Sequence, residues 1–578
     1  MKKKLQVFMV SWLVSMVSLW AQNRQITGIV SDGKEPVIGA SIQVKNSSLG
    51  TVTDANGRYV LSLPAQSTAI IVKGVGLKTK EVNISGLSEI NVTLEKDNVN
   101  LGEVVVTAFG IERERKTLGY SQQKVSGDEI RRSGEQNMIQ GLAGKAAGVY
   151  VQGSGGTPGA SSKVLLRGNV TFTGSNQPLI VVDGVPIDNS TNQSVAGDYP
   201  FNANLQGVNS SNRGVDINPD DIESMNVLKG PAAAALYGVR AGAGAIIITT
   251  KKGKKGTKSF SVDFGTSVEI SRVNKLPELQ MKYSQGTGGG VFNSDKSASV
   301  GPGKLVEGTP QSWGNLTKDS LGITPYDNMN DFFQTGYAYN QNLSITNNTE
   351  NSSMRISLGR LDQTGVIPNT KFERTSMRLS MDSRLSKKIV IGGTANLINS
   401  SGTRSQNGSN LSGVMLGLLR APNSFQLADP NSKGNDEWEI GFKNADGTQR
   451  QYVGVYDNPY WTVYENPYND NVNRILGNVN LTYDPLEWMS VTYRLGTDMY
   501  TDQRKQVFAI GSWAPDNAPG GEVDENIIRY KEVYSDLLVT FRKDFGNDIK
   551  TTLLVGNNLN HRYDQDLFSR GRDLGAPG

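Results

Sequence analysis

The chain has 578 residues, a formal net charge of +4, no cysteine and one histidine, His561. This length exceeds one ordinary core, so several domains are expected, and the small net charge indicates no nucleic-acid partner. The lack of cysteine excludes disulfides, thiolate chemistry and a lipidated N-terminal cysteine, and a single histidine excludes histidine pairs and histidine-rich metal sites.

The N-terminus is typical of a secretory signal peptide. Three lysines at positions 2–4 precede a mostly apolar run, 5–20, and Ala21 follows. The alternative is a membrane anchor, but the run falls short of the roughly 20 residues that span a bilayer. We therefore predict that residues 1–21 direct export and are removed. The remaining sequence has no apolar stretch of that length, so the exported protein is either soluble or a membrane β-barrel.

Residues 24–96 predict a small β-sandwich. Short alternating segments such as ITGIVSD and ASIQVKN are separated by turn pairs, including Asp32-Gly33 and Asn56-Gly57. The segment resembles the carboxypeptidase-regulatory-like, transthyretin-type domain. It has no histidine and no paired carboxylates in a catalytic arrangement, so we interpret it as a structural or docking module.

Residues 97–123 form a linker around a hydrophobic stretch, EVVVTAFG, that stands between polar and charged segments. It has two interpretations: the last strand of the preceding sandwich, or a strand left free for another protein. The sandwich already ends in EINVTLEK, and a polar break at 97–100 separates the two.

Residues 124–253 predict a compact α+β domain. The stretch from Ser126 to Val151 is expected to be one helix, capped by Ser126 or Asp128, with an apolar face. The strand QPLIVVDGVPI is expected to close on a hairpin turn at Asp183-Gly184. A short helix start, a strand and a second small-residue helix follow in INPDDIESMNVLKGPAAAALYG, and AGAIIITT supplies a further strand.

Residues 254–578 show apolar and polar residues in strict alternation. A soluble sandwich gives the same pattern, but strands of about ten residues, with short turns on one side and a long loop near 400–471, favour an outer-membrane barrel. Nine strands are predicted, near 258–270, 335–347, 352–362, 373–384, 388–399, 473–484, 487–500, 528–542 and 548–562.

The order of these parts resembles the SusC-like TonB-dependent outer-membrane transporters of Bacteroidetes. The resemblance rests on LAGKAAGVYVQ, VLLRG, IVVDGVPI, INPDDIESMNVLKGPAAAALYG and GAIIITTKKG in the α+β domain, and on LGRLDQTGVIPNTKFER and DNPYWTVYENP in the barrel region. It implies a β-rich fold made of a regulatory-like β-sandwich, an α+β plug at 124–253 and the first part of a transmembrane antiparallel β-barrel. Family barrels close with about 22 strands, so the chain is expected to be an N-terminal portion that does not transport by itself.

The resemblance also assigns partners and a site. The linker stretch becomes a TonB box, to which periplasmic TonB adds a strand; its residues are Glu103, Val104, Val105, Val106, Thr107, Ala108 and Phe109. A SusD-like surface lipoprotein, outer-membrane lipid and an extracellular glycan or peptide are the other expected partners. No catalytic residue, cofactor or metal site is expected.

Aromatic residues of the long loop are candidate substrate contacts, since rings stack on sugar faces. They are Tyr456, Tyr460, Trp461 and Tyr464. An interfacial or loop-packing role is the alternative. Two other functions stay open: a receptor for an iron chelate such as a siderophore or haem, and a surface binding protein that does not transport.

Overall fold

A computed structural model describes most of the chain between Asn23 and Gly575, so the predicted signal peptide lies outside the described residues. The interior segments that are not described are 34, 46, 48, 65–66, 75–76, 96–103, 107–111, 115–121, 154, 173–174, 192–196, 199–201, 255, 257, 288–310, 317–323, 408–410, 430, 432–436, 453–454, 515–519 and 546–548. The contacts divide the chain into an N-terminal unit, which ends near Val104, and a second unit formed by most of the remainder.

The N-terminal unit is the predicted β-sandwich. One sheet has the order β4-β1-β7 and the other β3-β2-β5-β6. Alternate residues of the strands point into one core, which includes Ile26, Ile42 and Leu63. Tyr59 lies in this core, its hydroxyl donates to the carbonyl of Ile90 at 2.9 Å, and burial raises the pKa of Tyr59 to about 12. The strands are β1 (Asn23–Ser31), β2 (Ser41–Val44), β3 (Gly50–Val52), β4 (Arg58–Pro64), β5 (Ala69–Lys73), β6 (Lys80–Asn83) and β7 (Val92–Thr93).

Residues 122–253, which include the predicted plug at 124–253, form an α+β domain around a five-stranded sheet of order β10-β17-β18-β13-β14; this domain is called the plug below. The predicted turn at Asp183-Gly184 joins β13 to β14, with φ of 49° and 86°, the left-handed conformations of a two-residue hairpin. The strands are β10 (Gln122–Ser126), β11 (Val149–Gly153), β12 (Ser162–Leu166), β13 (Leu179–Val182), β14 (Val185–Ile187), β15 (Gly197–Asp198), β16 (Asn202–Gln206), β17 (Ile222–Leu228) and β18 (Ala245–Thr250). The helices are α2 (Gly127–Arg132) and α3 (Pro231–Tyr237), with 3₁₀ turns at Gln140–Leu142, Arg213–Asp216, Pro219–Asp221 and Val239–Ala241.

The long helix predicted from Ser126 to Val151 is wrong beyond its first turns. Ser126 caps α2 as expected, in a capping box with Glu129. The helix then ends, because three glycines adopt left-handed conformations that no helix continues, Gly134, Gly144 and Gly148, with φ of 73°, 71° and 68°. The apolar residues of the predicted face are still buried, from irregular backbone and a 3₁₀ turn.

Nine antiparallel strands form a second sheet, here called the wall, in which each strand pairs with its neighbours in chain order. They are β19 (Ser259–Ser271), β22 (Gly336–Asn348), β23 (Ser352–Thr364), β24 (Lys371–Arg384), β25 (Ile389–Arg404), β26 (Tyr468–Leu486), β27 (Met489–Phe508), β28 (Glu522–Phe545) and β29 (Ile549–Arg572). The predicted nine strands are confirmed. Within the described residues, the edge strands β19 and β29 do not pair with each other.

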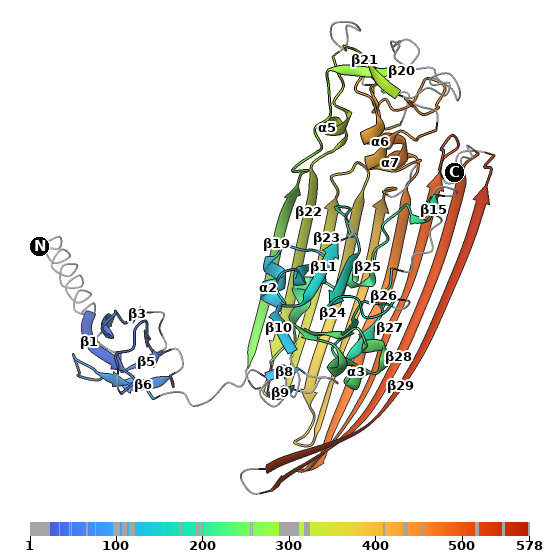
Figure 1. Ribbon diagram of the computed structural model, residues 1–578. Coiled ribbons are helices and arrows are strands. Elements are labelled where there is room, and N and C mark those ends of the chain that lie inside the picture. The colour runs from blue at the N-terminus through green and yellow to red at the C-terminus, as the bar shows by residue number, and fades with distance from the viewer. Residues whose placement is uncertain are drawn as a thin grey trace, which may run out of the picture. The chain divides into compact units, whose positions relative to one another are not determined.

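The two ends of the wall differ, as predicted. Short turns join β22 to β23 and β26 to β27 at one end, while the other end carries the long connection 405–467 (Figure 1). The long-loop end also holds α5 (Asn328–Phe332), α6 (Val414–Arg420), α7 (Pro459–Tyr464) and the hairpin of β20 (Tyr283–Thr287) with β21 (Gln311–Leu316).

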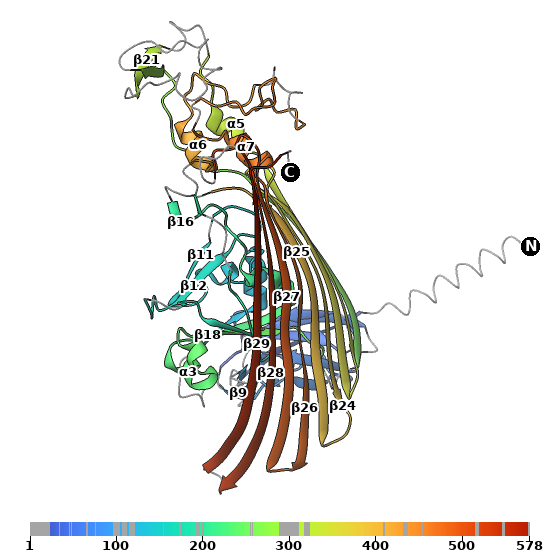
Figure 2. The same ribbon diagram turned by 90° about the vertical axis from the view of Figure 1, so that its right-hand side faces the viewer.

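The two faces of the wall are opposite in polarity. One face exposes apolar side chains such as Met377, Leu397 and Ile475, and the other buries polar ones such as Arg378, Asn396 and Arg474 against the plug. Figure 2 shows the plug lying along one side of the wall. A soluble sheet buries its apolar face, so this inverted arrangement favours the barrel over the soluble sandwich. Among the described residues, no helix combines the length and apolarity needed to cross a membrane.

Gly127 tests the packing at the start of the plug. A Cβ at this position would lie 1.9 Å from the carbonyl oxygen of Ile222, a backbone atom that cannot rotate away. We expect Gly127→Ala to lower the free energy of unfolding of the plug by more than about 2 kcal/mol, as overpacking does. The measurement is the denaturant midpoint in detergent. Gly265→Ala on β19 is the control, because its Cβ meets open space; equal midpoints for both variants would contradict the argument.

Candidate functional site

The predicted TonB box is described only in part. Val104–Val106 form a strand, β8, which pairs with β9 (Glu112–Glu114) in a two-stranded sheet. The structure therefore confirms the expected strand at the three valines. Glu103, Thr107, Ala108 and Phe109 lie outside the described residues. The role of the strand as a handle for another protein stays a prediction.

The plug meets the wall through a buried cluster of charged side chains. At its centre Arg474 of β26 donates to both carboxylate oxygens of Asp498 of β27, at 2.8 and 2.7 Å, and to Asp216 of the plug at 3.1 Å. Arg213 of the plug lies 3.6 Å from Asp216 and 3.9 Å from Asp502 of β27. All five side chains are almost completely buried. Each charge therefore depends on its partners, because water does not reach it.

A second anchor joins the hairpin turn of the plug to β24. Arg378 donates to the Asp183 carboxylate at 2.9 Å, and the same carboxylate accepts from the Thr250 hydroxyl at 2.6 Å. Burial favours the neutral acid, but Arg378, Lys252 and the Thr250 bonds together hold the pKa of Asp183 below its ordinary value. The ionised carboxylate of Asp183 thus binds the turn to Arg378 of the wall.

Two further arginines of the wall bind the backbone of the plug. Arg404 donates to the carbonyl of Pro158 at 2.8 Å and to the Ser211 hydroxyl at 2.6 Å, while Asp470 balances its charge. Arg374 donates to the carbonyl of Val215 at 2.7 Å. Arginine suits this role because its planar group presents five donors in fixed directions.

The plug also contacts β23 and β22, where the partners of its carboxylates differ. Asp221 of the plug accepts from Arg355 at 2.8 Å and from Ser357 at 2.6 Å, both on β23. Asp220 accepts only from neutral amides of β22, Asn340 and Asn342. The plug is therefore bound by ion pairs over most of the wall and by amide hydrogen bonds on β22.

The plug and the wall share little apolar surface. The apolar core of the plug is its own, and the wall contributes only Ile398 and Leu476 to it. A second small apolar cluster packs Val215 of the plug against Ala338, Leu361 and Phe372 of the wall. The other contacts described above are hydrogen bonds and ion pairs, and a neutral hydrogen bond is worth roughly 0.5–1.5 kcal/mol net. The boundary between plug and wall is therefore more polar than the core of the plug.

The motif DNPYW of the long loop joins several connections at the long-loop end of the wall. Asp457 accepts from Gln449 Nε2 at 2.8 Å and from the backbone N–H of Trp513 at 2.9 Å. Asn458 caps α7 and donates to the carbonyls of Leu427 and Arg450, both at 2.8 Å. Segments distant in sequence therefore meet on two adjacent side chains.

The candidate substrate contacts divide into two pairs. Tyr460 and Trp461 are 8% and 3% exposed and pack in the apolar cluster of the loops, and Trp461 Nε1 donates to Ser512 at 2.8 Å. This geometry matches the loop-packing alternative. Tyr456 and Tyr464 are partly exposed. Tyr464 lies 4.8 Å from the ring of Trp438, which is 43% exposed.

Sequence reasoning missed the charged residues of the inner face. Their signal was present, since Arg355, Arg374, Arg378 and Arg474 occupy inward positions of strands that the period-two pattern identified. Their partners lie far away along the chain and could not be read from the pattern. In the described residues, no group of three histidine or acidic side chains is placed to hold a metal ion.

Comparison with known proteins agrees with this architecture. The family model of the TonB-dependent receptor plug domain matches residues 114–245, and that of the CarboxypepD_reg-like domain matches residues 26–106. The TonB-dependent receptor SusC of Bacteroides thetaiotaomicron is 29% identical over 83% of this chain and 44% of its own length. The TonB-dependent receptor P26 of Formosa agariphila is 29% identical over 92% of this chain and 48% of its own.

A solved structure shows the same fold. The RagAB peptide importer in its closed-closed state superimposes with a TM-score of 0.59 at 20% identity, over 80% of this chain and 49% of that chain. This chain thus spans about half the length of these relatives.

The regulatory-like domain and the plug are thus domains found in TonB-dependent receptors of the outer membrane. Over most of its length, the chain is similar to the SusC/RagA type of that class.

The central ion cluster generates the first prediction of this site. We expect Arg474→Gln to lower the free energy of unfolding by about 3–5 kcal/mol, because Asp498 would remain buried without its cation and Asp216 would lose the nearer of its two cations. Arg360→Gln is the matched control: its partners Asp362 and Glu373 are exposed, so the loss should stay below about 1 kcal/mol. Tryptophan fluorescence during denaturation in detergent measures both. Equal losses would show that burial does not govern the cluster.

The second prediction concerns the buried carboxyl group of Asp457. Burial raises its pKa to about 6, against about 3.9 in an unfolded chain, so the folded loops bind its proton more tightly. The loop layer should therefore gain stability as pH falls from about 6 to about 4, and lose it as pH rises through that window. Hydrogen exchange of peptides covering 449–466, corrected for intrinsic rates, measures this.

The matched variants separate this carboxyl from general effects of pH. Asp457→Asn should remove the dependence, while Asp446→Asn, at an exposed turn, should leave it unchanged. The same pH dependence in Asp457→Asn would assign it to another group.

Proposed function

We propose that this chain serves TonB-dependent import of a large nutrient across the outer membrane, with the plug as the part that moves. The observation that supports this is the polar boundary between plug and wall. It contains buried ion pairs such as Arg474 with Asp216, yet little shared apolar core. A permanently fixed domain would gain more from apolar contacts, whereas a boundary of polar contacts can be broken and rehydrated.

The handle for this movement is residues 103–109. A short extended stretch without proline suits strand addition, because the main-chain hydrogen bonds are loaded together along the strand. The backbone at Val104–Val106 is already extended, as strand β8, and pairs with β9. In this proposal TonB replaces β9 as the partner strand and pulls the chain that leads into the plug.

The energy available is sufficient in magnitude. One elementary charge that crosses 100 mV releases about 2.3 kcal/mol. A domain is commonly stable by only about 5–15 kcal/mol. A few protons therefore supply enough work to detach or partly remodel the plug, provided that the pull reaches it through the linker.

The cargo in this proposal is a glycan or peptide, taken up with a SusD-like surface lipoprotein. The similar RagAB structures are of a peptide importer, which supports a large cargo. The ring pair of Tyr464 and Trp438 is partly exposed on the loop layer and suits a sugar face or an aromatic side chain. Tyr456, whose ring lies 4.1 Å from the Arg420 guanidinium, is the second candidate contact.

Val105→Pro tests the handle. Proline removes one backbone donor and is excluded from a paired strand, so binding of the periplasmic domain of TonB should fall at least tenfold. Val105→Thr is the matched control and should bind as the parent chain does, since threonine favours strands and keeps the donor.

In cells, uptake of labelled oligosaccharide or peptide should cease in Val105→Pro while surface binding persists. Unchanged uptake would refute the handle. Energy-dependent uptake of an iron chelate, without uptake of either nutrient, would favour the chelate receptor instead.

A further inference from the structure

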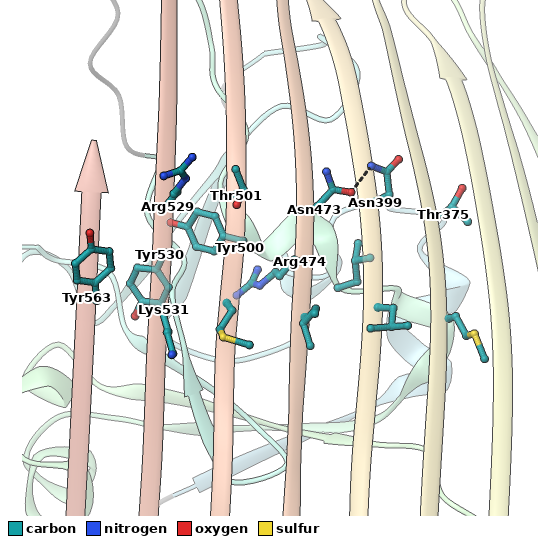
Figure 3. A pocket seen from close by; sticks show the side chains of 15 residues that line it. Thr375, Asn399, Asn473, Arg474, Tyr500, Thr501, Arg529, Tyr530, Lys531 and Tyr563 are labelled. Carbon is teal, nitrogen blue, oxygen red and sulfur yellow. Dashed lines mark hydrogen bonds between the residues drawn. The ribbon is translucent and has the colours of Figure 1, made fainter. Parts of the chain in front are cut away.

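The outer face of the wall carries a straight row of polar side chains near the upper edge of its apolar band. Cross-strand pairing aligns one residue from each of six successive strands. The row consists of Thr375, Asn399, Asn473, Thr501, Arg529 and Gln565. Figure 3 shows five of its members side by side across the strands, with the hydrogen bond between Asn399 and Asn473, which is 3.0 Å long.

The row directly below is largely apolar. It is formed by Met377, Leu397, Ile475, Met499, Lys531 and Tyr563. Below it, the outward residues are apolar except for Gly477 and Thr497, on β26 as far as Tyr483 and on β27 as far as Met489. Spans of 475–483 and 489–499 match the roughly 9–11 residues with which a tilted strand crosses the hydrocarbon layer. The polar row thus lies at the headgroup level on the long-loop side.

The two rows enclose an open hollow of about 750 Å³. Its lower part is apolar, and at one side Arg529 and Lys531 occupy neighbouring outward positions of β28. No aspartate or glutamate lines the hollow. The contrast with Arg360 is clear, because that arginine is neutralised by Asp362 and Glu373 on the same face.

Three cations line the hollow, and Arg474 among them is paired with Asp216 and Asp498 on the inner face. Among the described residues, neither Arg529 nor Lys531 has a carboxylate partner. Arg529 donates to the neutral amide of Gln565 at 3.3 Å. Lys531 stands opposite the apolar Met499 in the neighbouring strand, and no carboxylate lines the hollow beside it. A lysine in an apolar row at this depth is costly unless an anion accompanies it.

We propose that this hollow binds one phosphorylated, acylated lipid of the outer leaflet. Its phosphate would lie between Arg529 and Lys531, its neighbouring hydroxyl and amide groups along Asn473 and Asn399, and its acyl chains over Met377, Leu397 and Ile475. Arginine and lysine are the preferred phosphate ligands, and each cation near a lipid surface adds about tenfold or less to affinity. A soluble partner would not account for the apolar half of the site, which continues into the hydrocarbon band.

The test uses the full chain in detergent, with lipid A that carries two phosphates as the probe and native mass spectrometry as the readout. Arg529→Gln with Lys531→Gln should lower the apparent affinity at least tenfold. Arg529→Lys with Lys531→Arg should retain binding. Lys543→Gln is the matched control, since it removes a cation from the same face of β28 at the short-turn end.

Measurements on the unaltered chain keep the proposal independent of any folding defect in a variant. Dephosphorylated lipid A should bind at least tenfold more weakly, and millimolar inorganic phosphate should not displace the phosphorylated form. Equal binding of both lipids, equal loss in Lys543→Gln, or displacement by inorganic phosphate would each overturn the proposal, the last by assigning a simple anion site.

Discussion

The contact of Arg474 with Asp216 and Asp498 is the interaction on which the arrangement of plug and wall depends. A strand that crosses a membrane has one lipid face, so most polar side chains within the hydrocarbon layer point to the other face. Those side chains need partners, and the plug supplies them. The plug in turn presents carboxylates, among them Asp183 and Asp221, that would be unpaired without the wall. Each layer therefore supplies the counter-charges that stabilise the buried charges of the other.

Local signals predicted the elements whose causes are local. The cap at Ser126 and the turn at Asp183-Gly184 were correct, because short-range hydrogen bonds and left-handed backbone determine them. The helix beyond Arg132 was wrong, because apolar spacing outweighed the glycines in the interpretation. Predicted strand starts at 473 and 528 came late by five and six residues relative to β26 and β28. Both missed segments have one polar face and one face that mixes polar and apolar residues, so the alternation fades while the hydrogen bonding continues.

The candidate site could be predicted only where one segment carries it. The three valines of the linker predicted an extended strand without information from any other segment. The ion cluster did not, since Arg474 binds the carbonyl of Arg213, 261 residues away in sequence, through the register of the whole sheet. The loop aromatics failed for a related reason: Trp461 looks like a ligand platform until the partner Ser512 and the surrounding segments cover it.

The same period of two gives the wall two distinct polar surfaces. Inward polar residues are matched by protein, as Arg378 is by Asp183, so they specify where the plug lies. Outward polar residues above the apolar band have no protein layer against them. They pair with one another, as Arg360 does with Glu373, or interact with molecules at the membrane surface. Lys531 pairs neither with the plug nor with a carboxylate of the outer face among the described residues. In our proposal, a lipid phosphate supplies its counter-charge. Charge on the wall is therefore informative on both faces, because lipid and plug each penalise a charge that has no partner.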